Sequence, residues 1–132
     1  MKKLFFLLIS VSIITSCSKD ENTQPQKQTE NSDSIVGIWA LQKNNGFEVN
    51  DCEKKSTYTI KNDNTYTYNQ FTVTNRNCTE STKNFQKGEW KNNNNGTYYF
   101  KRHGFTSGGD IPIKFENNNE TMIIGRFTWI KK

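Results

Sequence analysis

The sequence predicts an all-β domain, a small antiparallel up-and-down β-barrel of about seven or eight strands. Strand-forming residues alternate with polar ones at a period of two, as in Thr65-Tyr66-Thr67-Tyr68, and this alternation is typical of strands with one buried face. Clusters of Asn, Asp and Gly interrupt the alternation at 62–64, 92–96 and 117–119. Because these residues tolerate the left-handed backbone of tight turns, the clusters indicate hairpin loops.

Seven strands follow from this pattern, together with a further short strand near 45–50. The seven cover residues 35–43, 56–61, 65–74, 84–91, 97–102, 111–116 and 121–130. Antiparallel strands joined by hairpins leave two exposed edges, and closing the sheet into a barrel removes both of them. A two-sheet sandwich is the alternative architecture.

The first residues have the pattern of a secretory signal peptide, which we expect to cover 1–16. Lys2 and Lys3 precede an apolar run at 4–14, and small residues follow it. The run is too short for a transmembrane helix, which takes roughly 20 residues. The signal indicates export from the cytoplasm.

The segment Ile14-Thr15-Ser16-Cys17 resembles the lipobox of bacterial lipoproteins. That resemblance implies that Cys17 is lipidated, becomes the new N-terminus and anchors the protein in a membrane through its acyl chains, palmitate among them. Ser18-Lys19-Asp20-Glu21 resembles the surface-export tag of some Gram-negative lipoproteins. We therefore expect a lipid anchor in the outer membrane, with the domain on the cell surface or, if the tag is only a polar spacer, on the periplasmic face.

The polar residues that follow divide the chain into anchor, tether and domain. Residues 18–34 contain no apolar side chain that could seed a core, so we expect 17–34 to be a lipidated cysteine with a disordered tether. Residues 35–132 form one small domain.

Two cysteines remain for the domain once Cys17 carries lipid. Export places Cys52 and Cys78 in an oxidising compartment, so we expect them to form a disulfide. These cysteines and the single histidine, His103, lack the spacing of a metal site. The sequence thus predicts a disulfide, no bound metal and no cofactor.

Two Gly-x-Trp motifs, Gly37-Ile38-Trp39 and Gly88-Glu89-Trp90, give the domain a resemblance to the lipocalin superfamily. Together with the order of cysteines and hairpins, they resemble the short lipocalin-like domains on lipoproteins of Gram-negative bacteria. The resemblance implies that Gly37 lets the chain turn into the barrel base and that Trp39 closes that end. It also implies that Arg126, on the last strand, lies against Trp39, unless Arg126 simply faces water.

The resemblance implies binding of a small hydrophobic molecule at the cell envelope. The body is shorter than a typical lipocalin, however, and its many aromatic residues favour a filled interior. The alternative function is therefore a filled barrel whose loops contact a surface protein or a glycan. A cavity of roughly 300 Å³ or more, open at one end, would favour the first function.

The sequence carries no constellation for catalysis. His103 is the sole histidine and stands in a loop, and the acidic residues are scattered among turns, so neither a nucleophile with its base nor a distinctive carboxylate pair is present. We expect a protein that is not an enzyme. The loop with His103, Phe105, Gly108 and Gly109 is long and glycine-rich, and we expect it to edge the barrel mouth and contact a ligand or partner.

The charge of the domain is mildly basic. From 35 to 132 there are 14 Lys and Arg against 9 Asp and Glu, with no dense basic run. This distribution lacks the basic stripe of nucleic-acid binding, which we therefore exclude as a function. Attraction to anionic glycans or lipids stays open.

Overall fold

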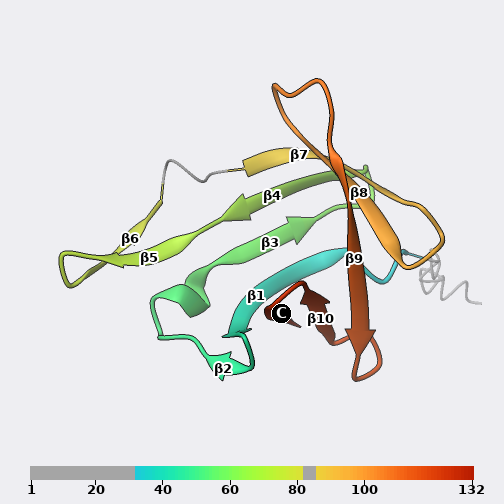
Figure 1. Cartoon of the computed structure of the whole chain (residues 1–132). Coiled ribbons are helices and arrows are strands. Elements are labelled where there is room, and N and C mark those ends of the chain that lie inside the picture. The colour runs from blue at the N-terminus through green and yellow to red at the C-terminus, as the bar shows by residue number, and fades with distance from the viewer. Residues whose placement is uncertain (1–31, 82–85) are drawn as a thin grey trace, which may run out of the picture.

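The computed structural model describes residues 32–81 and 86–132 and forms a closed antiparallel barrel of eight strands (Figure 1). The barrel strands are β1 (Gly37–Asn44), β3 (Thr57–Ile60), β4 (Thr65–Asn69), β7 (Gln86–Asn92), β8 (Thr97–Arg102), β9 (Gly109–Glu116), β10 (Thr121–Ile124) and β11 (Phe127–Lys131). Each pairs antiparallel with its neighbours, and β11 pairs with β1 to close the sheet. The predicted all-β barrel is confirmed, and the sandwich alternative is not adopted.

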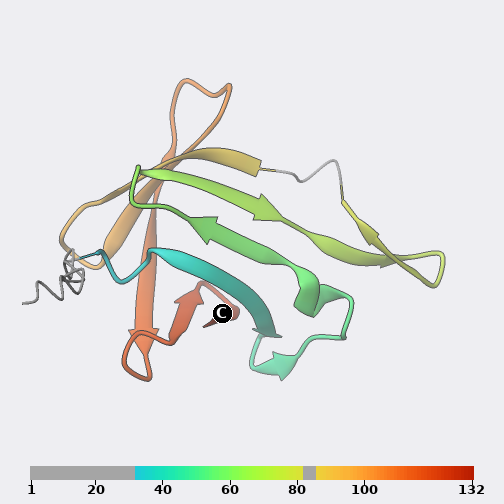
Figure 2. The same cartoon turned by 180° about the vertical axis from the view of Figure 1, so that it is seen from behind.

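Three shorter elements lie outside the ring. They are β2 (Phe47–Glu48), which pairs only with β1, and the two strands β5 (Phe71–Thr74) and β6 (Asn77–Glu80), which form a separate two-stranded sheet. A single 3₁₀ turn, η1 (Glu53–Lys55), precedes β3. Figure 2 shows from behind how the β5–β6 hairpin projects away from the barrel wall.

The predicted loops are the observed turns. Hairpin loops at 61–64, 93–96 and 117–120 join β3 to β4, β7 to β8 and β9 to β10. Their Asn residues carry the left-handed backbone that the prediction required, with φ of 63° at Asn64 and 58° at Asn94. The extra strand expected near 45–50 is also confirmed as β2.

Two predicted strands were wrong in extent. The segment 121–130 is two strands, β10 and β11, joined by a two-residue turn at Gly125 and Arg126. Gly125 has a φ of +57°, which a glycine adopts without steric cost. This extra reversal supplies the eighth barrel strand.

The segment 65–74 is likewise two strands, because the chain leaves the barrel at Gln70. The backbone N–H of Phe71 donates to the buried Ser56 hydroxyl at 2.9 Å, which fixes the point of departure. β5 then pairs with β6, a strand that the sequence analysis missed. The turn between them places Asn75 and Arg76 at positive φ, and an arginine is not a usual turn signal.

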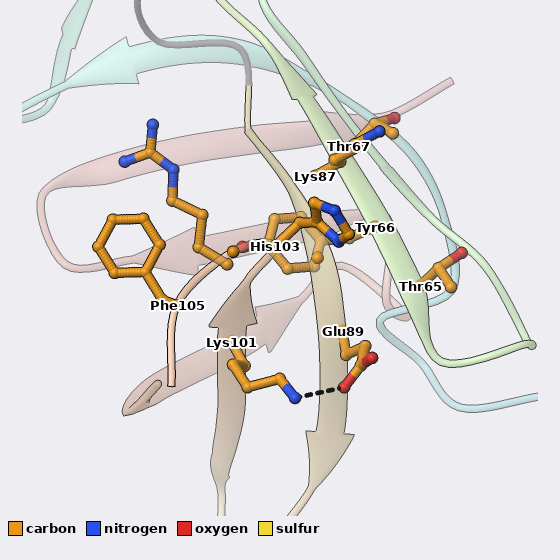
Figure 3. A pocket seen from close by; sticks show the side chains of 11 residues that line it. Thr65, Tyr66, Thr67, Lys87, Glu89, Lys101, His103 and Phe105 are labelled. Atoms are coloured by element: carbon orange, nitrogen blue, oxygen red, sulfur yellow. Dashed lines mark ion pairs between the residues drawn. The ribbon is translucent and has the colours of Figure 1, made fainter. Parts of the chain in front are cut away.

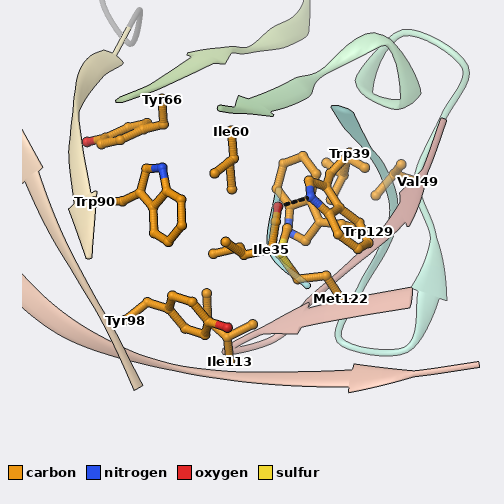
Figure 4. Packing of buried hydrophobic residues seen from close by; sticks show 11 residues of the cluster. Ile35, Trp39, Val49, Ile60, Tyr66, Trp90, Tyr98, Ile113, Met122 and Trp129 are labelled. Carbon is orange, nitrogen blue, oxygen red and sulfur yellow. Dashed lines mark hydrogen bonds between the residues drawn. The ribbon is translucent and has the colours of Figure 1, made fainter. Parts of the chain in front are cut away.

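The core fills the end of the barrel where β1 begins, and three of its members, Leu41, Val49 and Trp129, extend it toward the opposite end. Figure 4 shows its side chains converging from strands around the ring. The buried cluster comprises Ile35, Trp39, Leu41, Val49, Ile60, Tyr66, Trp90, Tyr98, Ile113, Met122 and Trp129. We call the end of the barrel where β1 begins the closed end. The opposite end, where β1 meets β2, is called the open end.

The closed end also holds the entering chain. The Asp33 carboxylate accepts a hydrogen bond from the Tyr98 hydroxyl at 2.8 Å and another from the Asn92 amide at 2.6 Å, and Ile35 is fully buried. The expected tether therefore stops before Asp33, because this carboxylate finds two partners on the barrel. The predicted signal peptide, Cys17 and the rest of the predicted tether lie outside the described residues. Within the described ranges, no helix has the length and apolarity to cross a membrane.

Candidate functional site

The open end of the barrel contains a cavity of about 400 Å³. Strands β1, β3, β4, β10 and β11, with the loop around η1, surround it. Its apolar wall consists of Leu41, Val49, Tyr58, Tyr68, Phe71, Ile124, Phe127 and Trp129, and its polar lining of Asn44, Glu53, Ser56, Gln70 and Arg126. The interior is thus filled at one end and hollow at the other.

Three packed aromatic rings form the side of this cavity. Alternation along the strands turns Tyr58, Tyr68 and Trp129 inward. The rings of Tyr58 and Tyr68 stack with centroids 4.5 Å apart, and Trp129 lies edge-on to Tyr58 at 4.9 Å. These mutual contacts give the cavity a rigid aromatic wall.

The phenols of this wall stay uncharged. Burial raises the pKa of Tyr58 well above its ordinary value, and the neighbouring Tyr68 and Tyr66 raise it further. Burial also raises the pKa of Tyr68. An ionised phenol here would lose its hydration, so the wall presents neutral aromatic surface to a ligand.

A second hollow of about 230 Å³ adjoins the cavity. It shares Tyr58 and Ile124 with the cavity, and its far side is formed by the β8–β9 loop, residues 103–108. From the predicted loop, Phe105 and Gly108 line this hollow. A Cβ on Gly108 would lie 2.0 Å from the Phe100 carbonyl oxygen, so only glycine lets the loop approach β8 this closely.

A third hollow, of about 360 Å³, lies on the outer wall over β4, β7 and β8 (Figure 3). We call it the outer groove. Its lining includes Thr65, Thr67, Lys87, Glu89, Lys101, Arg102, His103 and Phe105. The residues of the predicted contact loop therefore lie in different places. His103 lines the outer groove, and Phe105 lines both the outer groove and the hollow of about 230 Å³. Gly109 is the first residue of β9 and lines none of the three hollows.

The Cys52–Cys78 disulfide lies beside the open end, and the prediction of this bond is confirmed. The two Cα atoms are 5.4 Å apart. The bond joins the loop before η1 to strand β6 and so ties the projecting hairpin to the barrel. Both Glu53 of η1 and Phe71 of β5 line the cavity, so the disulfide supports its rim.

The described part of the chain gathers no group of three or more His, Cys, Asp or Glu side chains that could hold a metal ion.

Comparison with protein families then identifies the domain. A family model for the lipocalin-like domain matches residues 35–124. The chain belongs to the lipocalin-like domain family. No curated protein and no solved structure gives a significant match.

The Gly-x-Trp motif of this lipocalin-like domain lies at the closed end. Trp39 is fully buried, and its indole N–H donates to the Ile35 carbonyl at 2.7 Å. Gly37 has a φ of +147°, and a Cβ there would come within 2.8 Å of the Lys131 side chain. Glycine at this position therefore adopts the positive φ without strain and also leaves room for the Lys131 side chain.

The predicted contact between Arg126 and Trp39 is wrong. Arg126 lies in the β10–β11 turn at the open end, where its guanidinium is 5.2 Å from the ring of Phe127. The cation over Trp39 is instead the Lys131 ammonium, 5.2 Å from the ring. The error follows from reading 121–130 as one strand, since the extra turn moves Arg126 to the opposite end of the barrel.

Sequence analysis also missed the composition of the cavity. It placed the aromatic residues in the interior without distinguishing those of the filled end from those of the open end. Asn44 and Val49 gave no signal in the alternation, because Asn44 is the last residue of β1 and Val49 lies in the loop after β2. The sequence did contain one signal for these two residues, because Asn44 stands directly before Asn45-Gly46 and Val49 directly before Asn50. Residues beside such turns lie at an end of a barrel, where a cavity can open.

Proposed function

We propose that this lipocalin-like protein binds a small apolar molecule in the cavity at the open end of its barrel. The observation that carries the proposal is the cavity itself, about 400 Å³ with a wall of neutral aromatic and aliphatic side chains. Ligand pockets in proteins commonly have 300 to 1,000 Å³, apolar walls and a few polar groups. Lipocalin-like domains generally bind or carry molecules, which agrees with this arrangement.

The binding experiment uses N-phenyl-1-naphthylamine, a neutral apolar fluorophore. Ile124 lines both the cavity and the adjoining hollow, so Ile124→Trp places a bulky ring where the ligand would lie. We expect saturable binding to the native protein and at least about tenfold weaker binding to this variant, because the added ring takes the space in which the fluorophore would bury its apolar surface. Fluorescence titration measures both affinities.

Ile123→Trp is the matched control. Ile123 is the neighbouring residue of β10, and alternation turns it to the other side of the sheet. This variant should bind the fluorophore as the native protein does. Absence of saturable binding to the native protein, or equal binding by the Ile124→Trp variant, would exclude the cavity as the site.

We further propose that the protein is a lipid-anchored lipoprotein of the outer membrane. The support is the sequence pattern that ends at Cys17. Cys17→Ala in the full chain should shift the protein out of the membrane fraction, because several acyl chains hold a protein firmly and none would then be attached. Fractionation with immunoblotting measures this, and an unchanged membrane-bound share of the variant would contradict the anchor.

A second candidate function is contact with a surface protein or glycan through the open-end loops. The observation that favours it is the exposure of three apolar side chains on separate elements. Phe47 in β2 is 78% exposed, Phe105 in the β8–β9 loop 58% and Val73 in β5 51%. Exposed apolar tips of this kind mark interaction surfaces. If the native protein binds no apolar fluorophore, this candidate replaces the first.

A further inference from the structure

The three hollows adjoin one another in a row from the outer wall to the cavity, because each shares lining residues with the next. The outer groove and the hollow at the β8–β9 loop share Tyr66, Arg102 and Phe105. That hollow in turn shares Tyr58 and Ile124 with the cavity. The outer groove and the barrel interior are thus separated only by the hollow at the β8–β9 loop, which borders both.

The outer end of this row is positively charged. Lys87, Lys101 and Arg102 line the groove, against the single carboxylate of Glu89. Lys101 forms an ion pair with Glu89, in which the Lys101 Nζ lies 3.0 Å from the Glu89 Oε2 (Figure 3). The hydrogen bond between them raises the pKa of Lys101. Among residues 32–81 and 86–132, no carboxylate lies within ion-pair distance of Lys87 or Arg102. The groove thus keeps a surplus of positive charge.

The junction between groove and barrel holds an arginine and an aromatic ring. The Arg102 guanidinium lies 5.2 Å from the centre of the Phe105 ring, a cation–π distance that orients the guanidinium while leaving its donors available. Guanidinium groups suit phosphate and carboxylate because several N–H donors lie in one plane. Beyond this pair, the lining becomes apolar, with Phe100, Ile111 and Ile124.

We propose that the ligand is an anionic amphiphile, with its apolar chain in the barrel and its phosphate or carboxylate head in the outer groove beside Lys87 and Arg102. The proposal rests on the proposed uptake of apolar molecules and specifies their class. The lining is mainly basic in the outer groove and mainly apolar in the adjoining hollow and the cavity, where Glu53 and Arg126 are the charged exceptions. An anionic amphiphile matches this order of linings. A neutral apolar molecule would leave the charged groove unused.

The test compares four ligands with the same twelve-carbon chain: dodecyl phosphate, dodecanoate, dodecanol and dodecyltrimethylammonium. Each competes with N-phenyl-1-naphthylamine for the native protein. We expect both anions to bind about tenfold more tightly than dodecanol, and the cation to bind most weakly, because charge-assisted hydrogen bonds act on the anions alone. Added salt should reduce the preference by screening the exposed groove.

Two single variants locate the head. Lys87→Gln and Arg102→Gln should each weaken the binding of dodecyl phosphate about threefold to tenfold, and Lys87→Gln should leave dodecanol unaffected, because Lys87 lies outside the barrel hollows. Lys91→Gln and Lys114→Gln are matched controls that remove the same charge elsewhere. If the controls weaken dodecyl phosphate equally, overall charge accounts for the preference and the proposal is overturned.

The outcomes separate this inference from the proposed function. Equal affinity for the anions and dodecanol, with the fluorophore still displaced, overturns the anionic head and leaves apolar binding intact. No fluorophore binding at all overturns both. Displacement of dodecyl phosphate by an equal concentration of inorganic phosphate would mean that the chain contributes nothing, and this too overturns the proposal.

Discussion

Replacing Cys52 and Cys78 together with alanine should lower the free energy of unfolding by about 3.5 kcal/mol. The two residues are separated by 26 positions, and a crosslink over this length removes that much chain entropy from the unfolded state. Because a small domain is stable by only about 5 to 15 kcal/mol, the loss is large. Urea denaturation of oxidised native protein and of the double variant measures it.

The disulfide also holds the β5–β6 hairpin against the barrel in the folded state, in addition to its effect on the unfolded chain. β6 is exposed along its whole length, and β5 on half of its residues, so the bond is a principal tie between the hairpin and the barrel. We expect native protein treated with reductant to match the double variant. A double variant as stable as the oxidised protein would show that the bond contributes nothing to the fold.

Trp39→Ala should be the most destabilising single substitution at the closed end, with a loss of about 3 to 5 kcal/mol. Trp39 is fully buried, and its ring packs near Phe115 with centroids 5.9 Å apart. Removing it leaves a large void in the filled half of the barrel. Thermal and urea denaturation measure the effect.

A matched pair separates the indole N–H from the ring. Trp39→Phe removes the donor to the buried Ile35 carbonyl, whereas Trp129→Phe removes an indole N–H without a hydrogen-bond partner in the described part of the chain. An unpaired buried polar group costs about 1 to 3 kcal/mol. Trp39→Phe should therefore destabilise by about that much more than Trp129→Phe. Equal losses would mean that the Trp39 bond is unimportant.

The barrel was predictable from the sequence because local physics and overall fold agree in most of it. Alternation marks β3, β4 and β8, and the Asn clusters mark the turns that join them. The disulfide was predictable for a different reason, because two cysteines were left once Cys17 was assigned to lipid.

The errors arose where tertiary contacts override local pattern. Nothing within 65–74 announces that the chain leaves the barrel at Gln70, since the bond from Phe71 to Ser56 and the distant disulfide decide it. Within 121–130, a lone Gly125 marks a two-residue turn that was read as continuous strand. The cavity escaped prediction because inward-facing aromatics look alike whether they fill a barrel or line a hollow.

The seam between β1 and β11 sets the order in which the domain can fold. The ring closes only when the first barrel strand meets the last, and these strands are among the most distant in the chain. Contacts between remote segments form slowly, because a long loop must close before they contribute. An incomplete chain lacks β11 and leaves β1 with an open edge, so the barrel is completed only after the last strand becomes available.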